Sequence, residues 1–169
     1  MKRKLDLTAV LFVIYSILLL WVVLFKLSFS IDDIRSLAGE RSFNLIPFYY
    51  DNEVNVRFHM KEVMLNFVIF APFGFYLKML DAPTVRAFVC GLLTCISLEI
   101  IQFTSTIGAF DVTDIITNTA GCIIGVCACL LAIKLFKNKK RLYKTVNMLM
   151  LVALSLFAIL AAVLIIANK

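Results

Sequence analysis

The chain has 169 residues, of which 62% are hydrophobic, and a mean hydropathy of +0.97. A soluble domain is roughly 45–50% hydrophobic, and the apolar residues here form long blocks, so the composition excludes an ordinary soluble domain and indicates an integral membrane protein. The net charge of +6 does not indicate a nucleic-acid partner. The basic residues lie at the ends of apolar runs, which fits membrane topology and anionic lipid headgroups.

Five apolar stretches are long enough to cross a bilayer as helices, because a hydrocarbon core of about 30 Å needs about 20 helical residues. They predict an all-α integral membrane bundle that forms a single domain over residues 1–169. The predicted spans are at about 7–25, 64–80, 85–103, 115–136 and 146–167. The first follows the basic sequence MKRK and lacks a small-x-small cleavage site, so we interpret it as an uncleaved anchor helix.

The basic residues also predict the orientation of these spans. With the N-terminus in the cytoplasm, most of the 17 Lys and Arg residues face the same side, including those of KNKKRLYK at 137–144. The connection TSTIGAFDVTD, at 104–114, has no base. The positive-inside rule therefore predicts a multi-pass protein of the cell membrane with its N-terminus inside and its C-terminus outside.

A loop of mixed charge, about Ser28 to Glu62, separates the first two spans and is expected to lie outside. Its sequence SIDD, at 30–33, predicts a capping box that opens a short surface helix. The lone His59 is interpreted as a solvated loop residue. Four aromatic residues of this loop should rest at the level of the headgroups: Phe43, Phe48, Tyr49 and Tyr50.

All five cysteines lie within apolar segments, and none of their spacings is CxxC. Because their number is also odd, we interpret them as small buried hydrophobic residues rather than a disulfide framework or a zinc site. They are Cys90, Cys95, Cys122, Cys127 and Cys129.

The sequence LEIIQFTSTIGAFDVTDIITNTAGCIIG, at 98–125, gathers carboxylates and carboxamides without a single Lys or Arg. Residues three and four apart share a helical face, so Glu99 lies with Gln102 on the third span and Asp114 with Asn118 on the fourth. The short connection makes these two spans antiparallel neighbours. With Asn66 at the outer end of the second span, we expect these oxygen-bearing side chains to meet in one outward-opening pocket.

Several of these residues also have purely structural interpretations. Asp111 is a candidate N-cap of the fourth helix, and Asp114 lies near the positive end of its dipole. Asn118 is a candidate for an interhelical hydrogen bond, and Gly121 with Gly125 indicates a helix-packing seam. These alternatives remain open at the level of the sequence.

Glu99 is the residue that structural roles explain least. An acid costs about 2.5–3.5 kcal/mol at the centre of a bilayer, and less near the interface. A carboxylate near a helix C-terminus also opposes the helix dipole. Glu99 therefore needs a compensating partner.

Three segments, RSFNLIPF (41–48), NFVIFAPFGFYL (66–77) and the sequence from Glu99 to Gly125, together resemble the VanZ-like membrane proteins, a family named after a teicoplanin-resistance protein. The resemblance covers about residues 41–126. Its motifs contain the candidate binding residues Asn44, Asn66, Glu99, Gln102, Asp111, Asp114 and Asn118.

The chain departs from the family pattern in one place. Many members carry an Arg shortly before the first Asp of the third motif, where this chain has IGAFD. An Arg–carboxylate pair from that loop is therefore not available, and Arg41 of the outer loop is a candidate substitute.

The resemblance implies low-level glycopeptide or teicoplanin resistance. The first hypothesis is a non-enzymatic envelope protein whose pocket binds a membrane lipid headgroup, a lipid-linked cell-wall precursor or a lipoglycopeptide. The second is an intramembrane enzyme in which Glu99 and Asp114 act as acid and base on a lipid or glycan. A third, a cation or proton pathway, would require polar residues through the full thickness of the membrane. No cofactor is expected, although Ca²⁺ or Mg²⁺ would suit an all-oxygen site.

Overall fold

Five long helices account for most of the chain that the structure describes. The computed structural model describes residues 6–25, 43–49, 53–105, 110–136 and 138–167. All five helices are long and apolar enough to cross a membrane, so the prediction of an all-α membrane bundle is confirmed. They are α1 (Leu7–Phe25), α3 (Glu53–Met79), α4 (Thr84–Thr104), α5 (Val112–Phe136) and α6 (Lys139–Ala167).

Two of the helices begin well before the predicted spans. α3 begins at Glu53 and α6 at Lys139, because backbone hydrogen bonding continues into polar segments that hydropathy alone leaves out. His59 therefore lies within α3 and not in a loop, which corrects that interpretation. The predicted capping box at 30–33 and the candidate Arg41 lie outside the described residues.

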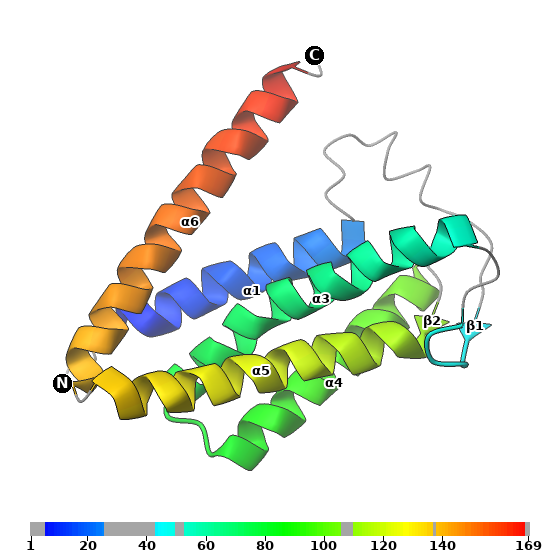
Figure 1. The fold of residues 1–169 in the computed structure, drawn as a ribbon. Coiled ribbons are helices and arrows are strands. Elements are labelled where there is room, and N and C mark those ends of the chain that lie inside the picture. The colour runs from blue at the N-terminus through cyan, green and yellow to red at the C-terminus, as the bar shows by residue number, and fades with distance from the viewer. Residues whose placement is uncertain (1–5, 26–42, 50–52, 106–109, 137, 168–169) are drawn as a thin grey trace.

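The helices α1, α3, α4 and α5 pack side by side, whereas α6 leaves this group obliquely (Figure 1). The closest approach joins α3 to α5. A Cβ added to Gly125 would stand 1.9 Å from the carbonyl oxygen of Ala71, and one added to Gly74 would stand 2.0 Å from that of Cys122. The glycines thus let two backbones touch, and the predicted packing seam on α5 is confirmed.

The cysteines mostly fill the core of this bundle. All five are free thiols, and three of them are buried: Cys95, Cys122 and Cys129. Cys90 is half-buried, and Cys127 is exposed on the outer face of α5. The prediction of small buried hydrophobic residues is confirmed for the three buried thiols, and Cys127 departs from it.

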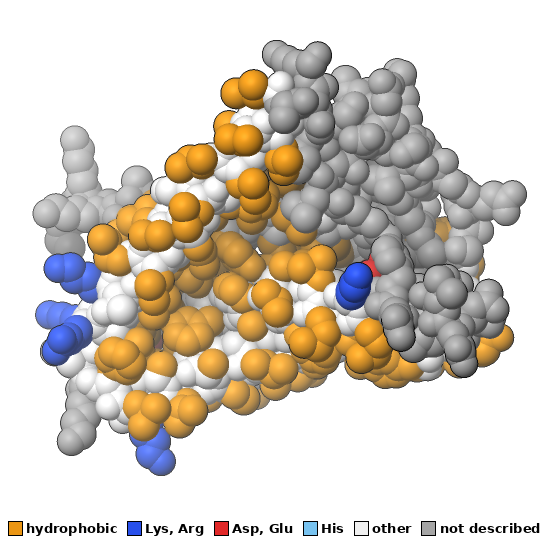
Figure 2. All heavy atoms as spheres, turned by 45° about the horizontal axis from the view of Figure 1, so that its top comes forward, with side chains coloured by type: hydrophobic (Ala, Val, Ile, Leu, Met, Phe, Trp, Pro, Cys, Tyr) orange, Lys and Arg blue, Asp and Glu red, His pale blue; other side chains and the backbone are white. Residues whose placement is uncertain are grey.

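Most of the described Lys and Arg residues lie at the end of the bundle where α6 begins. Figure 2 shows one face of the molecule, on which hydrophobic side chains cover the helices and several Lys and Arg side chains gather at that end.

A buried polar network lies in the half of the bundle where α6 begins. The hydroxyl of Tyr76 donates to Asn147 Oδ1 (3.2 Å), and Asn147 Nδ2 donates to the hydroxyl of Thr8 (3.0 Å). This network ties α6 to α1 and α3.

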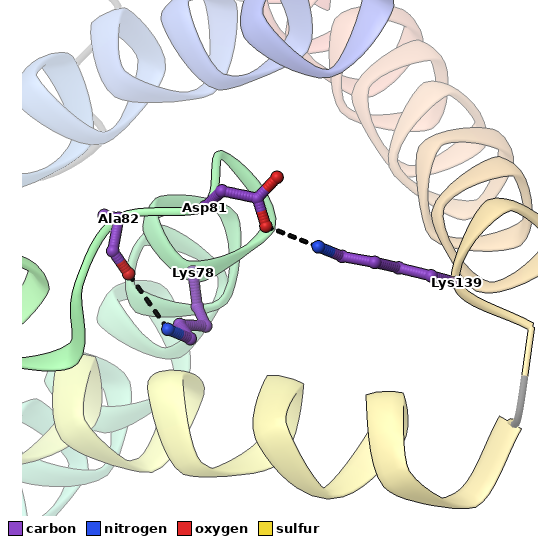
Figure 3. Close-up of polar contacts among 4 residues, drawn as sticks. All are labelled: Lys78, Asp81, Ala82 and Lys139. Atoms are coloured by element: carbon purple, nitrogen blue, oxygen red, sulfur yellow. Dashed lines mark hydrogen bonds and ion pairs between the residues drawn. The ribbon is translucent and has the colours of Figure 1, made fainter.

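One ion pair at this end joins α6 to the connection between α3 and α4 (Figure 3). Lys139 Nζ donates to Asp81 Oδ1, while Lys78 Nζ donates to the carbonyl of Ala82 at 3.0 Å. The side chains of Lys139 and Asp81 remain 47% and 73% exposed. Exposed pairs of this kind contribute only about 0–1 kcal/mol.

We therefore expect Lys139→Gln to change the melting temperature of the purified protein by no more than about 2 °C. The reason is that water and salt already screen the exposed pair. Thermal unfolding at low and high salt checks this. A large loss of stability at low salt would instead indicate that the pair is a main attachment of α6.

At the opposite end, two short strands cover the ends of α4 and α5. β1 (Phe43–Asn44) and β2 (Phe110–Asp111) pair in parallel, with Asn44 opposite Asp111. The ring of Phe43 packs against those of Phe103 and Phe110, at centroid distances of 4.2 and 5.9 Å. This pairing brings the first sequence motif onto the third. Of the four aromatic residues predicted to lie at the headgroup level, Phe43, Phe48 and Tyr49 are exposed, and Tyr50 lies outside the described residues.

Candidate functional site

A cavity of about 280 Å³ opens among α1, α3, α4 and α5 at the end that carries the two strands. On the orientation predicted by the basic residues, this is the extracytoplasmic end. Four of the seven candidate binding residues line the cavity: Asn66, Gln102, Asp114 and Asn118. Its remaining walls come from Val22, Val23, Lys61, Glu62, Leu65 and Ile69.

Asn66 holds α3 to the first turns of α5. Its Nδ2 donates to Asp114 Oδ1 at 2.8 Å and to the hydroxyl of Thr117 at 3.1 Å. Asp114 lies in the first turn of α5, where the helix dipole favours a negative charge. The two side chains that the sequence placed on separate spans are therefore in direct contact at the cavity wall.

Gln102 connects the cavity to the first helix. It is buried on α4, and its Nε2 donates to the carbonyl of Val23 on α1 at 3.0 Å. Because Val23 also lines the cavity, this hydrogen bond fixes the distance between the α1 and α4 walls.

Asn118 lies one turn below Asp114, about 6 Å deeper along α5 by helix rise. Its side chain is 1% exposed, and its Oδ1 has no hydrogen-bond partner among the described residues. Leaving a buried amide oxygen unpaired costs about 1–3 kcal/mol. The alternative interpretation of Asn118 as an interhelical hydrogen bond therefore finds no support in the described contacts.

Glu99 does not line the cavity. It is fully buried near the C-terminal end of α4, and its Oε2 accepts a hydrogen bond from the backbone N–H of Asp111 at 2.9 Å. This N–H supplies a partner of the kind that the position of Glu99 requires. Through this hydrogen bond, Glu99 holds the start of α5 in place.

Asp111 is the N-cap of α5, as the structural interpretation of the sequence proposed. Its Oδ1 accepts from the N–H of Thr113 at 2.7 Å, and its Oδ2 accepts from Asn44 Nδ2 at 3.1 Å. The hydroxyl of Thr113 in turn accepts from the N–H of Phe48 at 3.1 Å. Asn44, Glu99 and Asp111 therefore form a brace beside the cavity and do not belong to its wall.

Sequence reasoning missed Lys61 and Glu62, which also line the cavity. The predicted start of the second span at Met64 left them in a loop. Continuing the helical period back from Asn66 by four residues puts Glu62 on the same face. The cavity therefore has a nearby base after all, and it comes from α3 and not from the 98–125 stretch.

The separation of Glu99 from the cavity bears on the catalytic hypothesis. Asp114 faces the cavity, while the oxygen of Glu99 described above is directed at a backbone N–H. The two carboxyl groups therefore do not share the cavity as an acid–base pair. Among the described residues, no three His, Cys, Asp or Glu side chains form a group that could hold a metal ion.

Comparison with known proteins identifies relatives of the chain. A family model described as VanZ/LLP1 matches residues 12–137. The chain is 35% identical over 148 residues to "Protein VanZ" of Enterococcus faecium, an alignment that covers 85% of this chain and 88% of that protein. No solved structure matches. A family match over most of the chain, with a relative of this identity and coverage, establishes that the protein belongs to the VanZ/LLP1 family.

Proposed function

We propose that the protein binds the polar part of an amphiphilic molecule in the cavity beside Asn66, Gln102, Asp114 and Asn118. Candidate ligands are a lipid headgroup, a lipid-linked cell-wall precursor and a lipoglycopeptide. The observation that carries the proposal is the buried, unpartnered amide oxygen of Asn118, a residue that lines the cavity. A bound hydroxyl, amide or amine would supply the hydrogen-bond donor that the protein itself does not.

The walls of the cavity support an amphiphilic ligand. Val22, Val23, Leu65 and Ile69 provide apolar surface, and the carboxamides and carboxylates provide hydrogen-bonding groups among them. Pockets with a few oriented polar groups in an apolar lining are typical of specific ligand sites. The predicted position near the outer leaflet favours molecules that carry an acyl or polyprenyl chain.

Membership of the VanZ/LLP1 family supports a role of this binding in glycopeptide resistance. Teicoplanin-like lipoglycopeptides carry an acyl chain, so a membrane protein that binds them, or binds their lipid-linked target, would change how they reach that target. This proposal requires no catalytic step.

The proposal predicts that Asn118→Leu raises the stability of the protein while it weakens ligand binding. Leucine has nearly the shape of asparagine and no polar atom that needs a partner, so removing the unpaired amide should stabilise the fold by about 1 kcal/mol or more. The same change should weaken ligand binding at least tenfold, which corresponds to about 1.4 kcal/mol. Thermal unfolding in nanodiscs measures the change in stability. Binding of a labelled lipoglycopeptide and of a labelled lipid-linked precursor to the same nanodiscs measures the change in affinity.

Asn147→Leu is the matched control. Asn147 is also buried, but its carboxamide is hydrogen-bonded to Tyr76 and Thr8 in the other half of the bundle. This variant should lose stability and keep the affinity of the wild type. Equal binding of both ligands by the wild type, Asn118→Leu and Asp114→Asn would contradict the proposal.

A further inference from the structure

An apolar groove lies on the outer surface of α3, next to the cavity. This open, shallow groove is lined by Met60, Lys61, Met64, Leu65 and Val68. Two of these residues, Lys61 and Leu65, also line the cavity. The cavity and the apolar groove therefore meet at Lys61 and Leu65.

The apolar side chains of the groove are exposed. Met60, Met64, Leu65 and Val68 are between 46% and 63% exposed, so a chain lying along them would contact both the protein and the surrounding membrane. Such a surface fits an acyl chain, and the cavity fits the group that the chain carries.

Charges of both signs line the cavity. Lys61 is exposed and belongs to the groove as well, whereas Glu62, Asp114 and Asn118 belong to the lining of the cavity alone. In a phospholipid, the phosphate lies next to the chains and the amine is at the far end of the headgroup. A phosphate beside Lys61 would therefore direct an ammonium group toward Asp114 and Asn118.

We infer that the ligand of this site is a lipid whose headgroup carries a phosphate followed by a primary ammonium, as in phosphatidylethanolamine. This inference rests on the proposed function and specifies its ligand. Lys61 contacts the phosphate, Asp114 and Asn118 accept the N–H groups, and an acyl chain follows the groove along α3. The unpaired amide oxygen of Asn118 needs a hydrogen-bond donor. A quaternary amine has no N–H group and is therefore not expected to be the best ligand.

Binding of acyl-labelled lipids to the purified protein in lipid-free detergent micelles, with unlabelled competitors, tests the inference. Phosphatidylethanolamine should bind about tenfold more tightly than phosphatidylcholine, which has a phosphate and a cation without N–H donors. Phosphatidylglycerol should bind weakly, because it lacks the ammonium and meets the carboxylates of Glu62 and Asp114. Soluble O-phosphoethanolamine should bind at least tenfold more weakly than the lipid, because it cannot use the groove.

Two variants separate the contacts. Lys61→Gln should weaken phosphatidylethanolamine and phosphatidylcholine by a similar factor, because both present a phosphate. Asp114→Asn should weaken phosphatidylethanolamine alone and so remove the preference. Lys140→Gln, the same change at the opposite end of the molecule, should leave both affinities unchanged.

The outcomes distinguish the two proposals. The inference is wrong if phosphatidylethanolamine and phosphatidylcholine bind equally, or if phosphatidylglycerol binds most tightly. The proposed function still stands in that case, provided that the binding is saturable and is lost in Asn118→Leu. Equal affinity for the soluble headgroup and the lipid overturns the role of the groove. The absence of saturable binding for every amphiphile, the lipoglycopeptide and wall precursor included, overturns both.

Discussion

Replacing Gly125 by alanine is expected to destabilise the protein by about 3 kcal/mol or more, at the upper end of the usual cost of overpacking a core. The new Cβ would stand 1.9 Å from the carbonyl oxygen of Ala71 and 2.8 Å from the backbone nitrogen of Phe75. Both are backbone atoms of α3, so no rotation of a side chain relieves the clash. α3 and α5 must move apart, and the contact of Asn66 with Asp114 should be lost with them. Thermal unfolding of the purified protein, followed by circular dichroism, measures the effect.

Gly91→Ala provides the control, because its clash is with a side chain. A Cβ there would stand 2.5 Å from the sulfur of Cys122. The additional change Cys122→Ala removes that sulfur and should recover much of the lost stability, giving a clear coupling between the two positions. A melting temperature of Gly125→Ala close to that of the wild type would contradict the seam as the main contact of α3 with α5.

The membrane architecture followed from the sequence, because it depends on properties that act over a whole segment. The first predicted span coincides with the described helix α1, Leu7–Phe25, because a continuous apolar run of this length favours a single helix across the membrane. The starts of α3 and α6 did not follow, because hydropathy reports what enters the hydrocarbon and not where the helix begins. The error at α3 also concealed Lys61 and Glu62.

The composition of the cavity was partly predictable. Helical periodicity correctly grouped Asp114 with Asn118, and the short connection between spans brought Gln102 near them. Periodicity has no information about contacts between a side chain and the backbone of a loop. The position of Glu99 on the same helical face as Gln102 therefore suggested a shared pocket, whereas its Oε2 accepts from the N–H of Asp111, twelve residues further along the chain.

The brace beside the cavity also depended on a long-range contact. Asn44 meets Asp111 across 67 residues of sequence, and no local pattern predicts a parallel pairing of two-residue strands. The resemblance to a family placed both residues in motifs without saying that they touch. Their contact gives the first motif a structural role, which is to hold the segment after β1 against the N-terminus of α5.

Glu99→Ala is expected to cost about 3 kcal/mol, because it removes a hydrogen bond to a charged group, leaves the N–H of Asp111 unpaired and opens a cavity in the core. The effect should be local as well as global. With its brace removed, the start of α5 should open more often, and hydrogen exchange should accelerate at the amides of Asp111 and Thr113. The pairing of β1 with β2 should weaken in the same variant, which exchange across residues 43–49 measures.

Glu99→Gln separates the brace from the charge. Glutamine keeps the volume of the side chain and an oxygen that accepts from the N–H of Asp111, so less than half of the destabilisation should remain. Exchange at Asp111 should then stay close to that of the wild type. If Gln and Ala at this position are equally destabilising, the negative charge itself is what the site needs, and the N–H of Asp111 is not the main partner. If neither variant changes exchange at Asp111, the N–H of Asp111 is not the contact through which Glu99 acts, and its bracing role is wrong.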